Sequence, residues 1–200
     1  MSRAPIAVAV SGGGRSLENL LERELDHDAQ YRVAAVVTSH RDCRGAQIAT
    51  DRGLPLFAAA FPRETPEELK TLLESFLSRH QVSWVALAGF IRVFPCLPQW
   101  AQHIINIHPS LLPEFGGRGM YGDKVHQAVI AAGVAKSGAT IHFVNERYDE
   151  GHIIAQIEVP VGPRDGVDSL KSKVFAAEKI LYPKVLNQLI TGQLPLSDGQ

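Results

Sequence analysis

Cysteine is scarce in this sequence, in which only Cys43 and Cys96 occur among 200 residues. Neither belongs to the paired spacing that is typical of a metal site or a disulfide framework. A scaffold held together by disulfides is therefore excluded, and isolated thiols of this kind are typical of a reducing compartment. We expect a cytoplasmic protein.

An excess of charge of either sign is also lacking. The chain has 20 Lys and Arg against 21 Asp and Glu, which gives a formal net charge of -1 at pH 7. No basic stripe for nucleic acid and no polybasic membrane anchor is present. Neither nucleic acid nor a membrane is expected as a partner, whereas a small anionic ligand is compatible with this balance.

Long hydrophobic runs are missing as well. The apolar segment Pro5 to Val10 is too short for a signal sequence or a membrane span, and we interpret it as a buried first strand. The chain contains 45% apolar residues and no internal repeat, linker or low-complexity tract. A chain of this length and apolar content can bury one hydrophobic core, and we expect residues 1–200 to form a single domain.

Apolar strand patterns alternate with helical patterns, which predicts an α/β fold with a mostly parallel, helix-covered, Rossmann-like sheet. The last two strand patterns, Ala139–Val144 and Ile153–Val159, alternate apolar and polar residues and predict an antiparallel extension. The other strands are expected at Pro5–Val10, Tyr31–Thr38, Pro55–Ala58, Ser83–Ala88 and Ile104–His108, and the helices at Arg15–Leu25, Gly45–Arg52, Pro66–His80, Val125–Ala132 and Ser169–Gly192.

Two prolines affect the predicted helices. The segment Thr65-Pro66-Glu67-Glu68 combines an N-cap threonine, a proline at the first helical position and a capping-box glutamate, so we expect Thr65 to cap its helix. Pro183 lies inside the last predicted helix, where it removes a backbone hydrogen bond, and it predicts a kink at Tyr182-Pro183.

The segment Asn106-Ile107-His108-Pro109 places two polar side chains at the end of an apolar strand. Because side chains alternate along a strand, Asn106 and His108 point to the same side. A satisfied core Asn or a surface His explains one such residue alone. The pair, followed by a proline that stops the strand, indicates a site at the sheet edge where open α/β sheets bind ligands. There an amide and an imidazole can stabilise an oxyanion, and His108 can move a proton.

A glycine-rich turn, Ser11-Gly12-Gly13-Gly14-Arg15-Ser16, connects the first strand to its helix. Backbone N–H groups at a helix start bind anions, and glycine allows a phosphate to approach closely. The dinucleotide fingerprint is incomplete because Leu17 replaces its third glycine, and no P-loop lysine follows. The remaining interpretations are a phosphate monoester site built from Gly14, Arg15 and Ser16, or glycines that serve only the turn.

Two carboxylates complete the set of candidate site residues. Asp149 can pair with His108, raise the pKa of its imidazole and order a water molecule, although alone it is an ordinary turn aspartate. Glu178 falls on the apolar side of the last predicted helix, where it needs a partner such as a substrate amine, or else lies at the flank of the helix. The histidines show no metal-ligand spacing, and we expect no metal site.

Five segments together resemble the phosphoribosylglycinamide formyltransferases, folate-dependent enzymes of de novo purine synthesis. The element Asn-x-His-Pro-Ser-Leu-Leu-Pro with a downstream Asp-x-Gly is specific to the wider formyltransferase superfamily. The glycine turn and the chain length narrow the resemblance to the phosphoribosylglycinamide formyltransferases. The segments are Ser11–Leu17, Leu87–Arg92, Asn106–Pro113, Gly138–Val144 and Tyr148–Gly151.

This resemblance implies the formyltransferase fold and transfer of the formyl group of 10-formyltetrahydrofolate to the amino group of glycinamide ribonucleotide. Gly14, Arg15 and Ser16 would hold the phosphate of the ribonucleotide, and Glu178 would meet its glycinamide end. The assembly would be a monomer or a homodimer, without a metal. The folate would bind to Arg63, Ile91, Arg92, Val93, Phe94, Asn106, Asn145 and Asp149.

By the same resemblance, Asn106, His108 and Asp149 are the catalytic residues. The substrate amine attacks the formyl carbon, Asn106 and protonated His108 stabilise the oxyanion, and Asp149 holds His108 and a water that moves a proton. The chain departs from many relatives in Arg15 and Ser16, where smaller or amide residues are common, and in a Gly116–Gly122 loop without histidine.

Other formyl-group enzymes and a binding module are the alternatives. A 10-formyltetrahydrofolate hydrolase would use the same three residues with water as the acceptor, but such enzymes carry an N-terminal domain, and here the first strand begins at Pro5. Methionyl-tRNA and sugar-nucleotide formyltransferases carry a C-terminal domain that we do not expect here. A non-enzymatic nucleotide-binding module explains the glycine turn but not Asn106, His108 and Asp149.

Overall fold

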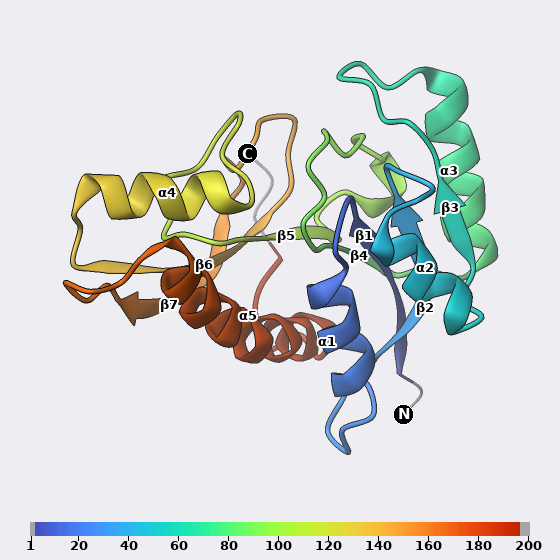
Figure 1. The fold of residues 1–200 in the computed structure, drawn as a ribbon. Coiled ribbons are helices and arrows are strands. Elements are labelled where there is room, and N and C mark those ends of the chain that lie inside the picture. Colours follow the sequence, from blue (N-terminus) through green and yellow to red (C-terminus); the bar gives the residue numbers. More distant parts are fainter. Residues whose placement is uncertain (1–2, 197–200) are drawn as a thin grey trace.

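The computed structural model describes residues 3–196, in which seven strands form one sheet in the order β3-β2-β1-β4-β5-β6-β7. The pairs among β1 to β5 are parallel, and β6 and β7 add to one edge as antiparallel strands. The predicted fold class is therefore confirmed (Figure 1). The elements are β1 (Ala4–Val10), α1 (Arg15–Arg23), β2 (Tyr31–Thr38), α2 (Arg44–Asp51), β3 (Leu56–Ala58), α3 (Glu67–Arg79), β4 (Trp84–Leu87), the 3-10 helix η1 (Pro98–Trp100), β5 (Ile104–His108), α4 (Asp123–Ala132), β6 (Lys136–Phe143), β7 (Ile153–Pro160) and α5 (Val167–Ile190).

Helices cover both faces of this sheet. One apolar layer joins the sheet to α1, α2, α4 and α5, and the other joins it to α3 and η1. Figure 1 shows α5 beside α1, with α3 well apart from both. In β1, Ile6 and Val8 enter the first layer while Ala7 and Ala9 enter the second. Burial on both faces explains why the first strand is a continuous apolar run.

The start of α3 differs from the sequence prediction. The helix begins at Glu67, and its N-cap residue is Pro66, whose ψ of 148° is extended and which makes no side-chain cap. Thr65 therefore lies one residue too early to cap the free N–H groups, and its hydroxyl is buried without a hydrogen-bond partner among residues 3–196. The predicted threonine cap is wrong because Pro66 stays outside the helix instead of forming its first position.

The strand order reverses between β1 and β4, and this topology brings two connections together. The Ser11 N–H donates to Gly89 O at 3.1 Å, and the Ser11 hydroxyl accepts from Ile91 N–H at 3.0 Å. The glycine turn after β1 is thereby bonded to the segment after β4. Both segments lie at the carboxyl edge of the sheet, where β5 also ends.

The long helix α5 continues through Pro183. Proline leaves the carbonyl four residues earlier, that of Lys179, without its helical donor. The side-chain amide of Asn19 on α1 donates to this carbonyl at 3.3 Å, so a neighbouring helix compensates for the loss. The kink at Tyr182-Pro183 stays a prediction.

Tyr182 fixes α5 under the centre of the sheet. Its side chain is buried, and its hydroxyl donates to Leu87 O of β4 at 2.9 Å. Ile105 O of β5 lies 3.4 Å from the same hydroxyl. Because Glu178 precedes Tyr182 by about one helical turn, this contact also sets the position of Glu178 relative to the ends of β4 and β5.

We predict that Tyr182→Phe lowers the free energy of unfolding by about 1–2 kcal/mol, because a buried carbonyl loses its hydroxyl donor. Urea denaturation measures this change. Tyr121→Phe is the matched control, since Tyr121 is 42% exposed, and it should change stability by less than about 0.5 kcal/mol. Equal effects of the two substitutions would contradict an anchoring role for the Tyr182 hydroxyl.

Candidate active site

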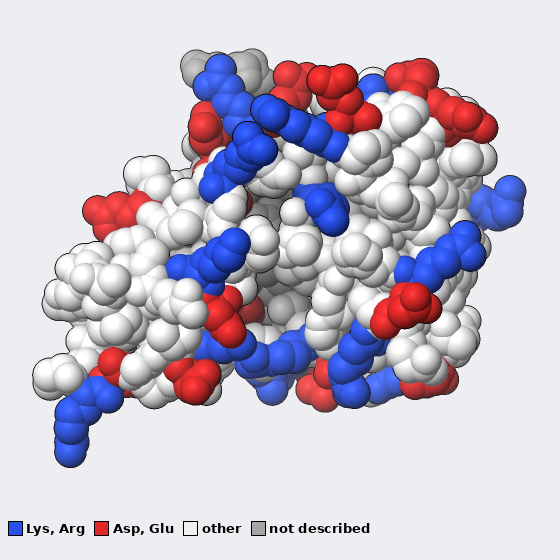
Figure 2. Space-filling view, turned by 45° about the horizontal axis from the view of Figure 1, so that its top comes forward, with Lys and Arg blue, Asp and Glu red and all other residues white. Residues whose placement is uncertain are grey.

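A cavity of about 770 Å³ opens at the carboxyl edge of the sheet. Its wall combines the glycine turn after β1, the segment after β4, the end of β5, the loop before α4 and one side of α5. The space-filling view shows a hollow near the middle of one face with Lys and Arg side chains around it (Figure 2). The basic wall residues Arg15, Arg63, Arg92, Arg118 and Lys171 outnumber the acidic ones, Asp149 and Glu178.

Most of the predicted site residues lie in this wall. The two exceptions, Phe94 and Asn145, line a small pocket of about 60 Å³ that shares Arg92, Asn106 and Asp149 with the cavity. Phe94 is only 3% exposed, and its ring packs against that of Phe90 in the same segment after β4. The wall contains Gly14, Arg15, Ser16, Arg63, Ile91, Arg92, Val93, Asn106, His108, Asp149 and Glu178.

Asn106, His108 and Asp149 come together at one point of the wall. Asn106 and His108 extend from β5, and Asp149 belongs to the connection between β6 and β7. The Asp149 Oδ2 atom lies 3.4 Å from His108 Nδ1, and Oδ1 lies 3.5 Å from Asn106 Nδ2. The predicted pairing of Asp149 with His108 is therefore present.

A tight connection holds Asp149 in this place. Its φ of 58° is in the left-handed region, which aspartate tolerates better than most residues. Gly117 N–H donates to its Oδ2 at 2.9 Å. A Cβ atom on Gly151 would lie 1.6 Å from Phe143 O, so only glycine lets the chain fold back this closely. Asp149 and Gly151 are thus one geometric unit, which explains the Asp-x-Gly pattern.

His142 is a site residue that sequence reasoning missed. It is 2% exposed, and its Nδ1 lies 2.8 Å from Phe143 O, to which it donates. Its Nε2 can then accept from Asn106 Nδ2, which is 3.0 Å away. The signal for it was the antiparallel register, which pairs Asn106 with His142 and His108 with Thr140 and so brings their side chains together.

Burial decides the charge of His108. Its Nε2 donates to Phe115 O at 2.9 Å. Burial lowers the pKa of the imidazole below its ordinary value, while the Asp149 carboxylate and the Phe115 carbonyl act in the opposite direction. Asp149 raises this pKa, as predicted, but the net shift is downward because the loss of hydration outweighs the attraction of one carboxylate.

Asp149 is ionised at neutral pH. Burial acts to raise its pKa, but the neighbouring His142 and His108 and the hydrogen bond from Gly117 N–H outweigh it and hold the pKa below its usual range. Asp149 is thus a fixed negative charge between two imidazoles. Within residues 3–196, no group of three or more His, Cys, Asp or Glu side chains is arranged to hold a metal ion.

The glycine turn is open on its cavity side. A Cβ atom at Gly12 or Gly13 would have no neighbour within 4 Å, so a ligand can approach the backbone there. Gly14, with a φ of 69°, precedes α1 and makes no side-chain cap, which leaves the first N–H groups of the helix to bind an anion. The Arg15 guanidinium lies 3.6 Å over the centre of the Phe175 ring.

Glu178 faces the cavity from α5. Burial raises the pKa of its carboxyl to about 7, and Arg15 opposes this rise only in part. The side chain is therefore neither a surface glutamate nor a fixed charge. A positively charged or hydrogen-bonding ligand can set its ionisation near neutral pH.

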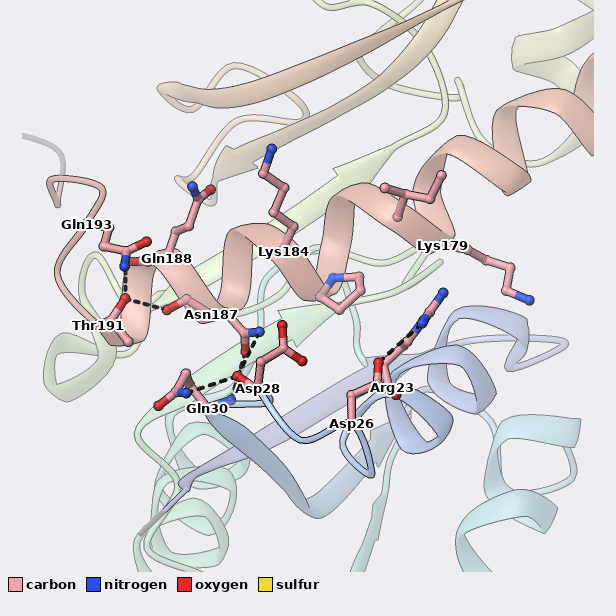
Figure 3. A pocket seen from close by; sticks show the side chains of 12 residues that line it. Arg23, Asp26, Asp28, Gln30, Lys179, Lys184, Asn187, Gln188, Thr191 and Gln193 are labelled. Carbon is pink, nitrogen blue, oxygen red and sulfur yellow. Dashed lines mark hydrogen bonds and ion pairs between the residues drawn. The ribbon is translucent and has the colours of Figure 1, made fainter. Parts of the chain in front are cut away.

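A second hollow, of about 540 Å³, lies between the segment after α1 and the second half of α5. Some of its polar groups are bonded to one another, whereas the Lys179 and Lys184 side chains are drawn without such a bond (Figure 3). Arg23 contacts Asp26 at 3.2 Å, and Asn187 accepts from Gln30 N–H at 2.9 Å. No predicted site residue lines it, and we therefore place the candidate active site in the larger cavity.

Comparisons with known proteins find similar chains. The chain is 40% identical over 190 residues to a chloroplastic phosphoribosylglycinamide formyltransferase from Vigna unguiculata. That alignment covers 94% of this chain and 61% of the relative. The chain is 32% identical to the phosphoribosylglycinamide formyltransferase of Haemophilus influenzae, and the alignment covers 97% of this chain and 91% of the relative. A crystal structure of phosphoribosylglycinamide formyltransferase from Anaplasma phagocytophilum is 32% identical, with a TM-score of 0.83 over 98% of this chain and 92% of that one.

The chain spans 61 to 65% of the length of the three chloroplastic relatives that it matches. Over its own length the match is nearly continuous, and residues 4–186 fit the family described as formyl transferase. These residues include the whole sheet and every residue that lines the cavity. The chain belongs to the formyl transferase family.

Proposed function

We propose that this protein transfers the formyl group of 10-formyltetrahydrofolate to the amino group of glycinamide ribonucleotide, giving the N-formyl product and tetrahydrofolate for purine synthesis. The observation that carries the proposal is the convergence of Asn106, His108 and Asp149 in a cavity that also contains an anion-binding turn. The names of the relatives support the choice of the two substrates.

The cavity suits one ligand at each end. The phosphate of the ribonucleotide would bind at Gly14, Arg15 and Ser16, and Glu178 would accept from its glycinamide end. The opposite end would take the folate, with its pterin against the connection that contains Asn145 and Asp149 and with its carboxylates toward the exposed cations. Its contacts would be Arg63, Ile91, Arg92, Val93, Asn145 and the supporting Phe94. The formyl carbon would then lie near Asn106 and His108.

Asn106 would be the first donor to the oxyanion. One hydrogen of its side-chain amide is used by His142 Nε2 at 3.0 Å, which fixes the orientation of the amide. The second hydrogen meets Asp149 Oδ1 over 3.5 Å, a long contact that is easily exchanged. An oxyanion on the formyl carbon is a stronger acceptor at a better distance, so this interaction strengthens as the charge develops.

His108 would supply the second interaction as an imidazolium. Phe115 O and Asp149 Oδ2 lie opposite the two ring nitrogens, so the surroundings are shaped for two N–H donors. Burial nevertheless keeps the resting ring neutral by lowering its pKa. A nearby oxyanion tips this balance toward the charged form. His108 therefore gains its charge when the transition state needs it.

The substrate can provide that proton. The glycinamide amine resembles a peptide α-amino group, whose ordinary pKa is about 7.7–8.0, and much of it arrives as ammonium. One proton moves to His108 as the amine bonds to the formyl carbon, whose oxygen takes the electron pair of the C=O π bond. Water held by Asp149 then carries a second amine proton to the folate nitrogen, as the oxygen re-forms the C=O bond and the bond between the formyl carbon and that nitrogen breaks. One proton is released overall.

The decisive experiment measures tetrahydrofolate release from 10-formyltetrahydrofolate with and without glycinamide ribonucleotide. Release that requires the ribonucleotide, together with its formylated product, is the expected result. Equal release without the ribonucleotide would contradict the proposal and make water the acceptor. No release in either case would leave the cavity as a binding site alone and would equally reject the transferase.

Location and assembly also belong to the proposal. No helix in the described part of the chain is both long and apolar enough to cross a membrane. We propose a cytoplasmic location, although several plant relatives are named as chloroplastic. A monomer or a homodimer is proposed, because the residues named for catalysis and for both substrates come from one chain.

We predict that His108→Gln and Asp149→Asn each lower kcat by about 10²–10³ while the dissociation constant for glycinamide ribonucleotide changes little, because each removes an interaction of the transition state. The double variant should lose much less than the product of the two factors. Asp149→Asn should also lower the pKa of His108 further, as measured by NMR titration, because it removes a charge that raises it.

Asp168→Asn is the control for this pair, since Asp168 is exposed and lies outside the cavity. It should retain full activity. Weakened binding of the ribonucleotide that accounts for the whole loss in the His108 or Asp149 variants would assign these residues to binding instead of catalysis.

We predict that Glu178→Gln reduces kcat/KM but stabilises the fold at pH 8. The folded-state pKa of about 7 exceeds the ordinary 4.5, so the carboxyl destabilises the folded protein progressively as pH rises through this window. Removing it should add up to about 3 kcal/mol at pH 8, reduced by cavity water, and much less at pH 5. Urea denaturation at both pH values, with exposed Glu68→Gln as the control, measures it. The same gain at pH 5 and pH 8 would refute a raised pKa.

A further inference from the structure

His126 is a second buried histidine in the cavity wall, and the proposed mechanism does not use it. It projects from α4 and is 4% exposed, yet it lines the cavity. Its Nδ1 atom is fully buried and has no hydrogen-bond partner, and within residues 3–196 no hydrogen bond joins either of its ring nitrogens to another group. A buried polar group without a partner is costly and calls for an explanation.

The surroundings of His126 are basic. Arg15 at the start of α1 and Lys171 on α5 belong to the same wall, and each is close enough to repel a charge on the imidazole. Lys171 is paired with Asp123, the first residue of α4, and Asp123 lies on the same side of that helix as His126. The Arg15 guanidinium is held over the Phe175 ring. Asp123 is thus the one carboxylate among the groups that act on the charge of His126, against Lys171, Arg15 and His108.

We infer that the His126 imidazole binds the phosphate of glycinamide ribonucleotide together with Arg15 and Lys171. This inference rests on the proposed function, since it adds a residue to the phosphate end of the same cavity. A phosphate there meets the uncapped start of α1 on one side and His126 on the other. It can accept from the Nε2 atom, which is not fully buried and has no partner among residues 3–196, and it balances the surplus of basic groups.

Binding is then linked to protonation of His126. In the free protein, burial and the charge of Lys171 lower its pKa, Asp123 raises it, and His108 and Arg15 lower it, so the ring is neutral at pH 7. A phosphate dianion adds about two negative charges and favours the imidazolium. The pKa of the bound form is therefore higher than that of the free form. Affinity should fall as pH rises through the bound-state pKa, because the proton gained on binding becomes harder to acquire.

Titration calorimetry on the intact protein at pH 7.5 tests this linkage. Binding of glycinamide ribonucleotide is measured in two buffers of different ionisation enthalpy, which gives the number of protons taken up. The dephosphorylated glycinamide riboside is measured in the same way. Because it carries the same amine, subtracting its proton uptake removes the contribution of the amine. We expect extra proton uptake for the ribonucleotide alone. Equal uptake with both ligands would overturn the inference without any need for a variant.

Variants separate a phosphate contact from a structural role. His126→Gln cannot be protonated, and it should abolish the extra uptake and weaken ribonucleotide binding by about tenfold or more. It should leave riboside binding unchanged. His27→Gln is the matched control, because His27 is exposed and lies outside the cavity. Equal losses for both ligands in His126→Gln would assign His126 to the fold and reject the inference.

This experiment does not depend on turnover. A protein that binds the ribonucleotide with proton uptake at His126 but transfers no formyl group would refute the proposed function and leave the phosphate contact standing. Formyl transfer without the extra proton uptake would support the proposed function and refute the phosphate contact of His126.

Discussion

The antiparallel pairing of β6 with β5 is the constraint on which the site depends. This pairing sets His142 beside Asn106 and Thr140 beside His108. It also carries the connection with Asp149 back over the end of β5. The Thr140 hydroxyl accepts from Leu112 N–H and donates to Ser110 O, so the loop that leaves β5 is held by the same pairing.

The chemistry of the cavity follows from incomplete compensation of buried charge. Asp149 keeps its charge because two imidazoles and a backbone N–H surround it. Burial favours the neutral form of His108 and raises the pKa of Glu178 to about 7, so the charge of each can change near neutral pH. Groups balanced in this way respond to charge brought by a ligand or formed during a reaction, whereas fully paired groups do not.

Local sequence signals were enough for most of the fold. The strands Tyr31–Thr38 and Ile104–His108 were predicted to the residue, since apolar runs bounded by turns leave little choice. The N-cap of α3 was predicted wrongly, because the extended backbone of Pro66 determines where the helix begins. At the site, the periodicity of β5 predicted one shared side for Asn106 and His108. Predicting the role of His142 would have required the register between β5 and β6. Predicting the net pKa shift of His108 would have required its depth of burial. A single segment of sequence encodes neither.

The placement of basic residues in the cavity has a consequence for ligand encounter. The chain as a whole is nearly neutral, so its field at a distance is weak, and physiological salt screens what remains beyond about 8 Å. An anion therefore diffuses to the molecule almost unguided and feels the cations only at the mouth of the cavity. The basic wall acts within about one screening length of the cavity mouth, where it raises the local concentration of anions.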